Sequence, residues 1–155
     1  QPIEVRSLLE DVVDAAQHLA PRNWEVEADV QLIVRGDRTK LRGALLNLID
    51  NAVNATGEAD TIRIAALRDD ARDVVFEVTD TGRGLSSADQ QGLFERFSRS
   101  TDRYRGSGLG LAIVKAVADA HGGRVTIDGA PGEGCRVRIV LPSERIVSVE
   151  QVAVV

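Results

Sequence analysis

Residues 39–55 read TKLRGALLNLIDNAVNA, and this stretch carries two patterns on one predicted helix. Apolar residues recur at helical spacing on one face, namely Leu41, Leu45, Leu48, Ile49 and Ala52. Because positions i, i+4 and i+7 share a face, a second face presents Asn47, Asn51 and Asn54. Asn is a poor helix former, and a plain solvent face would more readily use Glu, Lys or Arg. The three Asn residues therefore indicate neutral ligands for a polar group or a hydrated cation, with an ordinary solvated face as the alternative.

The flanking sequence predicts further helices and strands around this helix. Helical spacing of apolar residues predicts helices over about residues 5–19 and 109–120. Alternating or continuous apolar residues predict strands near 24–30, 61–67, 73–79, 125–127 and 135–141. Helices and strands are interspersed without a strict βαβ alternation, which favours an α/β (α+β) two-layer sandwich with a mixed sheet and helices on one face. We expect one domain over residues 1–143 and a tail of unassigned role over 144–155.

Composition limits the class of protein. A chain of 155 residues with 43% hydrophobic and 28% charged residues is an ordinary globular domain rather than a disordered segment. Nineteen Lys and Arg against 24 Asp and Glu give a net charge of −5, which disfavours a general nucleic-acid or membrane-surface binder. One cysteine and two histidines offer neither an intrachain disulfide nor a zinc cluster. No apolar run approaches 18 residues, and the start at Gln1 suggests a fragment or a processed product.

An acidic turn follows the strand predicted near 73–79. It reads Asp80-Thr81-Gly82-Arg83-Gly84. A short acidic residue followed by two glycines lets the backbone approach a flat ligand closely. A carboxylate only accepts hydrogen bonds, so Asp80 would suit an exocyclic amine such as that of adenine. The alternative is an ordinary Asp-x-Gly turn.

A glycine cluster precedes the last predicted helix. It reads Gly106-Ser107-Gly108-Leu109-Gly110. Exposed backbone N–H groups and the positive end of a helix together form a cradle for phosphates. The spacing matches neither of the two familiar nucleotide-binding glycine motifs, and a flexible loop entering a helix is the alternative.

The segment before this cradle is a long, locally basic loop. Residues 85–107 show weak periodicity, and a loop of this length inside a compact domain is usually functional, often as a lid. Four arginines lie in a ten-residue stretch of this loop, namely Arg96, Arg99, Arg103 and Arg105. In an acidic chain this local reversal of charge suits a triphosphate, with a solvated charged loop as the alternative. Two phenylalanines, Phe94 and Phe97, are expected to anchor the base of the loop on the core.

Taken in order, these segments resemble the boxes of sensor histidine kinases, within the gyrase, Hsp90, histidine kinase and MutL superfamily. The asparagine box is residues 46–52, the first glycine box 80–85, the phenylalanine box 94–97 and the second glycine box 106–114. Gly36-Asp37, His121-Gly122-Gly123 and Gly132-Glu133-Gly134 also fit the pattern. The resemblance covers roughly residues 3–142, and four boxes in order at compatible spacing are highly specific.

The resemblance implies a Bergerat fold, with a mixed, mostly antiparallel sheet under three helices, that binds ATP and Mg²⁺. It implies that Asn51 coordinates Mg²⁺, Asn47 contacts the nucleotide or hydrated metal, and Asp80 binds the adenine amine. The remaining implied ATP-binding residues are Gly82 and Gly84 around adenine, and Arg99, Arg105, Gly106, Ser107, Gly108, Leu109 and Gly110 around the phosphates. Two positions depart from the pattern, because Asn54 stands where Lys or Arg is frequent and Ala55 where Tyr or His is frequent.

The resemblance also implies a protein-histidine kinase whose phosphoacceptor lies elsewhere. Neither His18 nor His121 is followed closely by an acidic residue in an acceptor-like motif, so both are expected to be structural or exposed. Asn47 stands where ATPase relatives carry a general-base Glu, which favours phosphoryl transfer over hydrolysis.

The expected partners are an upstream dimerisation domain carrying the acceptor His and, indirectly, a response regulator. Neither nucleic acid nor direct membrane contact is expected for this segment. The expected location is cytoplasmic, in a parent protein that is either soluble or anchored in the bacterial inner membrane. The alternatives are a serine kinase of the anti-sigma-factor type and a non-catalytic nucleotide-binding or interaction module.

Overall fold

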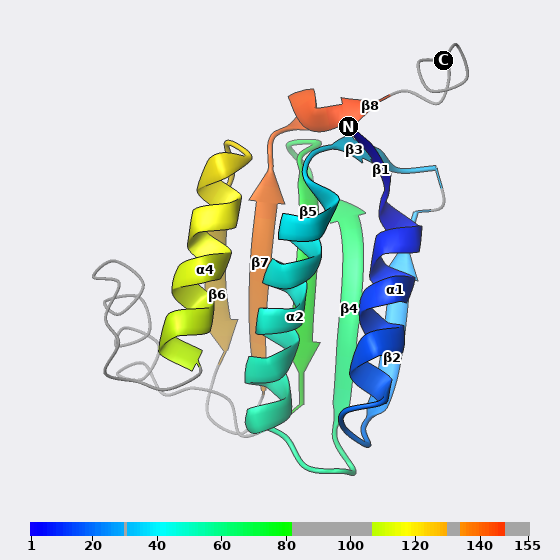
Figure 1. Cartoon of the computed structure of the whole chain (residues 1–155), viewed down its shortest axis with the longest axis vertical. Coiled ribbons are helices and arrows are strands. Elements are labelled where there is room, and N and C mark those ends of the chain that lie inside the picture. The colour runs from blue at the N-terminus through cyan, green and yellow to red at the C-terminus, as the bar shows by residue number, and fades with distance from the viewer. Residues whose placement is uncertain (30, 82–106, 130–133, 148–155) are drawn as a thin grey trace.

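Three described helices lie side by side over one face of a five-stranded sheet (Figure 1). The computed structural model describes residues 1–29, 31–81, 107–129 and 134–147, and the structural statements below concern these ranges. The helices are α1 (Val5–Gln17), α2 (Arg38–Asn54) and α4 (Ser107–Ala120). The predicted two-layer α/β sandwich with the Bergerat arrangement of a mixed sheet is confirmed.

The main sheet has the strand order β2-β4-β5-β7-β6. Its strands are β2 (Asn23–Ala28), β4 (Thr61–Arg68), β5 (Val74–Asp80), β7 (Cys135–Leu141) and β6 (Arg124–Gly129). Strand β2 runs parallel to β4, and the three other neighbouring pairs are antiparallel. The sheet is therefore mixed but mostly antiparallel, as expected from the sequence.

The core lies between the helices and this sheet. On α1, Val5, Leu8 and Val12 are fully buried because their helical spacing places them on one face. On β5, Phe76 and Val78 alternate inward, and Phe76 is fully buried. Truncating a buried Phe to Ala typically costs about 3–5 kcal/mol, so Phe76→Ala should strongly destabilise this layer.

A second, smaller sheet pairs strands from near the N-terminus with a strand at the end of the last described range. Its order is β1-β3-β8, with β1 (Pro2–Glu4), β3 (Ile33–Arg35) and β8 (Ile146–Val147). A short 3₁₀ helix, Ser143–Arg145, leads into β8, which pairs antiparallel with β3 and buries Val147. These residues begin the stretch expected to be a tail. Residues 148–155 lie outside the described ranges, and the domain boundary at residue 143 stays a prediction.

The face of the sheet opposite the helices carries a network of charges centred on Glu77. This residue alternates with the inward-facing Phe76 and Val78, yet is only 7% exposed. Arg138 donates through Nε to Glu77 Oε1 at 2.7 Å, and Arg63 donates through Nη1 to Oε2 at 3.3 Å. Arg63 also pairs with Glu27 on β2, so the ion pairs span four neighbouring strands, β2, β4, β5 and β7, and compensate a nearly buried carboxylate.

Candidate functional site

The predicted binding residues that the structure describes gather at one end of the domain. Helix α2 ends at the end of the molecule where α4 begins and where β5 terminates in Asp80 (the lower end in Figure 1). Helix α2 packs directly against both α4 and β5. The fold therefore brings the asparagine face, the strand-end carboxylate and a helix N-terminus to a common region.

The three asparagines of α2 differ in environment. Asn47 is half-buried and donates through Nδ2 to the Gly43 carbonyl one turn earlier at 3.0 Å. Asn51 is also half-buried, but its Nδ2 atom is buried without a hydrogen-bond partner among the described residues. Asn54 is the last residue of the helix and is exposed. Of the three, Asn51 has a buried donor without a partner among the described residues, which an acceptor such as a phosphate oxygen or a metal-bound water would complete.

Asp80 ends β5 and is only 5% exposed. It lies between Ile62 of β4 and Cys135 of β7 in the sheet register. Gly134, in the predicted Gly-Glu-Gly motif, approaches so closely that a Cβ there would lie 1.8 Å from the Asp80 carbonyl oxygen. Gly134 also has φ +84°, which only glycine adopts without strain. This glycine therefore fixes the backbone beside the predicted adenine-binding carboxylate.

Cys135 lies beside Asp80 in the sheet, and its thiol ionises less readily than an unperturbed thiol. Burial, followed by the negative charge of Asp80, raises the pKa of Cys135 from 9.0 to about 11. The predicted adenine end of the site therefore combines a carboxylate with a half-buried, poorly ionising thiol.

Several predicted residues lie outside the described ranges. They are Gly82, Gly84, Phe94, Phe97, Arg99, Arg105 and Gly106, together with the rest of the predicted lid. Ser107, Gly108, Leu109 and Gly110 form the first turn of α4, which begins two residues before the predicted start at Leu109. The described part of the predicted phosphate cradle thus lies at a helix N-terminus, where positive partial charge favours an anion.

The chemistry of the described residues fits a magnesium–nucleotide complex better than a metal held by protein alone. No group of three or more His, Cys, Asp or Glu side chains among the described residues could hold a metal ion. Mg²⁺ in phosphate-binding sites usually takes one or two protein oxygens and completes its shell with phosphates and waters. The carboxamide of Asn51 is such an oxygen donor.

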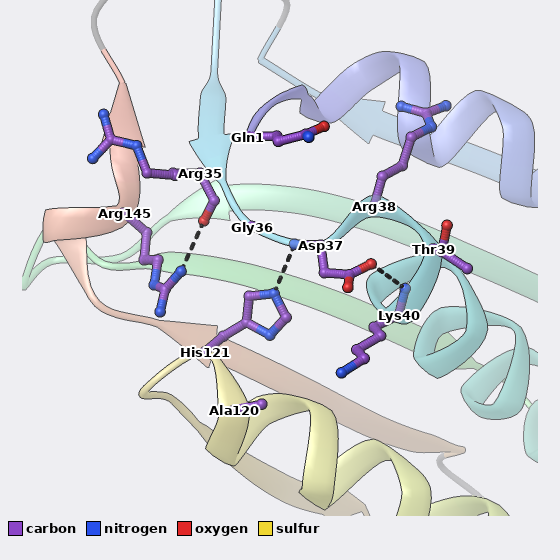
Figure 2. Close-up of a pocket in the computed structure, with 10 residues that line it drawn as sticks. All are labelled: Gln1, Arg35, Gly36, Asp37, Arg38, Thr39, Lys40, Ala120, His121 and Arg145. Carbon is purple, nitrogen blue, oxygen red and sulfur yellow. Dashed lines mark hydrogen bonds between the residues drawn. The ribbon is translucent and has the colours of Figure 1, made fainter.

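The opposite end of the domain holds a cavity of about 610 Å³ that is remote from these residues (Figure 2). His121 lines this cavity, is 4% exposed, and makes a hydrogen bond through each ring nitrogen. The Asp37 backbone N–H donates to Nε2 at 3.0 Å, so Nδ1 carries the proton and donates to the Val117 carbonyl at 2.8 Å. A Cβ at Gly36 would lie 2.9 Å from Nε2, which explains glycine there. His121 locks the end of α4 to the start of α2, as a structural histidine.

His18, the other histidine, is exposed after the end of α1. The prediction that the two histidines are structural or exposed is therefore confirmed for both side chains.

The sequence did not reveal a group of polar residues that contact the end of α2 and the residue after Asp80. Arg22 contacts the last turn of α2, and Asp60 contacts Thr81, the residue after Asp80. Arg22 and Thr56 are 34 positions apart, and Asp60 and Thr81 are 21 apart. Neither pair forms a motif, so periodicity and local spacing carried no signal for them.

This fold, with an asparagine-bearing helix α2 packed on the strand β5 that ends in a buried carboxylate, is that of a nucleotide-binding domain of the Bergerat class. Residues 36–145 match the family described as histidine kinase-, DNA gyrase B-, and HSP90-like ATPase, and the chain belongs to this family. The family match begins at Gly36, beside His121, and ends at Arg145, before β8.

Named sensor kinases are similar over nearly the whole chain. The circadian input-output histidine kinase CikA of Synechococcus elongatus is 30% identical over 95% of this chain and 21% of its own length. The structure of the mycobacterial sensor histidine kinase MprB superposes with a TM-score of 0.77 at 29% identity, covering 92% of this chain and 96% of that one. Full-length ShkA, solved in complex with AMPPNP, gives a TM-score of 0.74 at 30% identity, covering 96% of this chain and 31% of its own.

The chain spans between 17% and 39% of the length of the curated relatives it matches. It corresponds to the ATP-binding catalytic domain of such kinases, as the resemblance of its four boxes implied.

Proposed function

We propose that this chain binds Mg·ATP and donates the γ-phosphoryl group to a histidine on an upstream dimerisation domain. The observation that carries the proposal is that α2, whose C-terminal half bears Asn47 and Asn51, ends at the same end of the domain as β5, which terminates in Asp80, and where α4 begins. The similarity to ShkA, which was solved with an ATP analogue, supports the choice of nucleotide.

In this proposal each described side chain has one role. Asp80 accepts a hydrogen bond from the adenine amine, and Asn51 provides an oxygen to Mg²⁺. Asn47 contacts the nucleotide or a water of the metal. Bound Mg²⁺ neutralises charge on the phosphates that develops as the phosphoryl group departs. The N-terminus of α4, from Ser107 to Gly110, holds the phosphates, and Arg99 or Arg105 adds positive charge.

The absence of a general base at position 47 favours transfer over hydrolysis. A carboxamide has no useful basicity at neutral pH, so Asn47 cannot activate water for attack on the γ-phosphate. The acceptor is not His121, which is buried and has both nitrogens committed to hydrogen bonds. A positioned histidine on another domain is the acceptor that agrees with both facts.

Partners and location follow from this role. The direct partner is the upstream dimerisation domain, and a response regulator receives the phosphoryl group afterwards. We place the segment in the cytoplasm, where ATP is available. No described helix is long and apolar enough to cross a membrane.

The test uses γ-labelled ATP with the protein extended to include its upstream domain. We expect label that is stable in base and lost in acid, as for phosphohistidine, and no stable label on the isolated 155-residue chain. Base-labile, acid-stable label on a protein serine would instead identify an anti-sigma-type kinase. Binding of Mg·ATP without any label on the extended protein would identify a non-catalytic nucleotide-binding module, and no binding at all would identify an interaction module. The relatives are named sensor kinases, which does not favour either alternative.

A further inference from the structure

The guanidinium of Arg22 closes the C-terminal end of α2. Its Nη2 donates to the carbonyls of Val53 at 3.1 Å and Thr56 at 3.0 Å. Its Nε donates to Thr56 Oγ1 at 2.8 Å, and that hydroxyl donates to the Ala52 carbonyl at 2.8 Å. Arg22 is itself half-buried and lies between α1 and β2. One side chain from outside the helix thus contacts the Val53 carbonyl directly and the Ala52 carbonyl through the Thr56 hydroxyl.

This contact supplies what α2 lacks at its own end. The last turn contains no basic residue, and the capping residue Ala55 has right-handed helical angles rather than a glycine cap. The last carbonyls of a helix have no intrahelical partner and carry partial negative charge. A cation that donates to these carbonyls stabilises the end of the helix against fraying.

Asn51 lies in this last turn. The Ala55 backbone N–H donates to the Asn51 carbonyl at 3.2 Å. The Nδ2 atom of Asn51 is buried but has no hydrogen-bond partner among the described residues. Its carboxamide is therefore located by the helix backbone beneath it, and that backbone is held by Arg22.

A second set of contacts extends from this turn to the adenine side of the site. The backbone N–H of Asn23, next to Arg22, donates to the Asp60 carbonyl at 3.0 Å. Thr81 Oγ1 donates to Asp60 Oδ1 at 3.3 Å and accepts from the Thr61 backbone N–H at 2.9 Å. Thr81 directly follows Asp80. Arg22 therefore contacts the turn that carries Asn51, while Asp60, which bonds to the residue after Arg22, contacts the residue after Asp80.

We propose that Arg22 is a positioning residue for the metal and phosphate side of the nucleotide site, acting through the last turn of α2 on Asn51. This inference rests on the proposed function and adds a residue outside all four boxes. It predicts a selective effect. Loss of Arg22 weakens ligands that engage Asn51 through Mg²⁺ and phosphate, and spares ligands that engage only the Asp80 side.

The test compares two ligands by calorimetry on the 155-residue chain, namely Mg·AMPPNP and adenosine. We expect Arg22→Gln to weaken Mg·AMPPNP about tenfold, the scale of one or two lost charged hydrogen bonds, and to change adenosine affinity less than twofold. Arg22→Lys retains a cation near the carbonyls and should recover part of the loss. The matched control is Arg6→Gln, because Arg6 is an exposed arginine on α1 whose ion pair is with Glu10 one turn away.

The outcomes separate the inference from the proposed function. Equal weakening of both ligands by Arg22→Gln, or no weakening of either, overturns the positioning role. A wild-type chain that binds neither ligand overturns the proposed function and this inference with it. If Arg22→Gln does not fold, Thr56→Val removes the Nε contact together with the hydroxyl's bonds to the Ala52 and Val53 carbonyls. It leaves the Nη2 contacts in place and must show the same selectivity to a smaller degree.

Discussion

At the scale of single residues, Asn51 is the side chain whose environment most directly implies a ligand. A buried donor without a partner costs about 1–3 kcal/mol, so such a group is expected where binding completes it. We predict that Asn51→Ala abolishes the dependence of ATP affinity on Mg²⁺ without lowering the melting temperature. Titrations in Mg²⁺ and in EDTA measure the first effect. Asn54→Ala, at the exposed end of the same face, is the control and should keep the dependence. Persistent Mg²⁺ dependence in Asn51→Ala would contradict the assignment.

Cys135 gives a second prediction at this scale. Its thiol has a pKa of about 11, against 9.0 without the protein environment, and so stays neutral to higher pH. At pH 8 its thiolate fraction is therefore about 100-fold below that of an unperturbed thiol, and alkylation by iodoacetamide should be slower by a similar factor. Between pH 9 and 11 only the unfolded chain ionises this thiol, so stability should fall as the pH rises through this interval. Alkylation at the rate of a denatured control would show that the thiol is not shielded.

At the scale of elements, the charge network across the outer face of the sheet should contribute measurably to stability. Glu77 is 7% exposed and accepts from Arg63 and Arg138, both of which are partly exposed. We predict that Glu77→Ala lowers the free energy of unfolding by about 1–3 kcal/mol, because charged hydrogen bonds are lost and two arginines lose their shared partner. Urea denaturation measures this, and the exposed Glu25→Ala on β2 serves as the control. A change as small as that of the control would show that the network is energetically neutral.

Elements with long, regular patterns could be predicted from the sequence. The helices near 5–19, 39–55 and 109–120 appear as α1, α2 and α4 with ends shifted by one or two residues, since caps rather than periodicity set the ends. Strands β1, β3 and β8 have only two or three residues each, which is too short for alternation to be recognised. The alternation in β2 suggested that Val26 is half-buried, yet it is 40% exposed, because β2 forms an edge of the main sheet.

The candidate site likewise contains residues that could be predicted from the sequence and a residue that could not. Asn47, Asn51 and Asp80 could be identified because each belongs to a local motif whose chemistry is visible in a few neighbouring residues. Arg22 could not, because its contacts with Thr56 exist only once α1, β2 and the end of α2 are packed together. The predicted binding residues are recognisable in this sequence, whereas the proposed positioning residue could be recognised only from the fold.

At the scale of the whole molecule, the domain has two functionally different ends. One end brings together the predicted nucleotide residues, and the other is locked by the hydrogen bonds of His121 to Asp37 and Val117. Helices α2 and α4 connect the two ends as packed neighbours. These hydrogen bonds link the two helices that carry Asn51 and the predicted phosphate-binding turn.

The central claim is that this domain is an adenine-specific nucleotide site, and calorimetric titration of the 155-residue chain with ATP and GTP tests it most directly. Asp80 can accept from the amine of adenine, whereas guanine presents a carbonyl at that position and would face the carboxylate. We predict binding of ATP, much weaker binding of GTP, and a loss of about ten- to hundredfold in ATP affinity for Asp80→Asn. Equal affinities for ATP and GTP, or an Asp80→Asn variant that binds ATP as tightly as the wild type, would contradict the account.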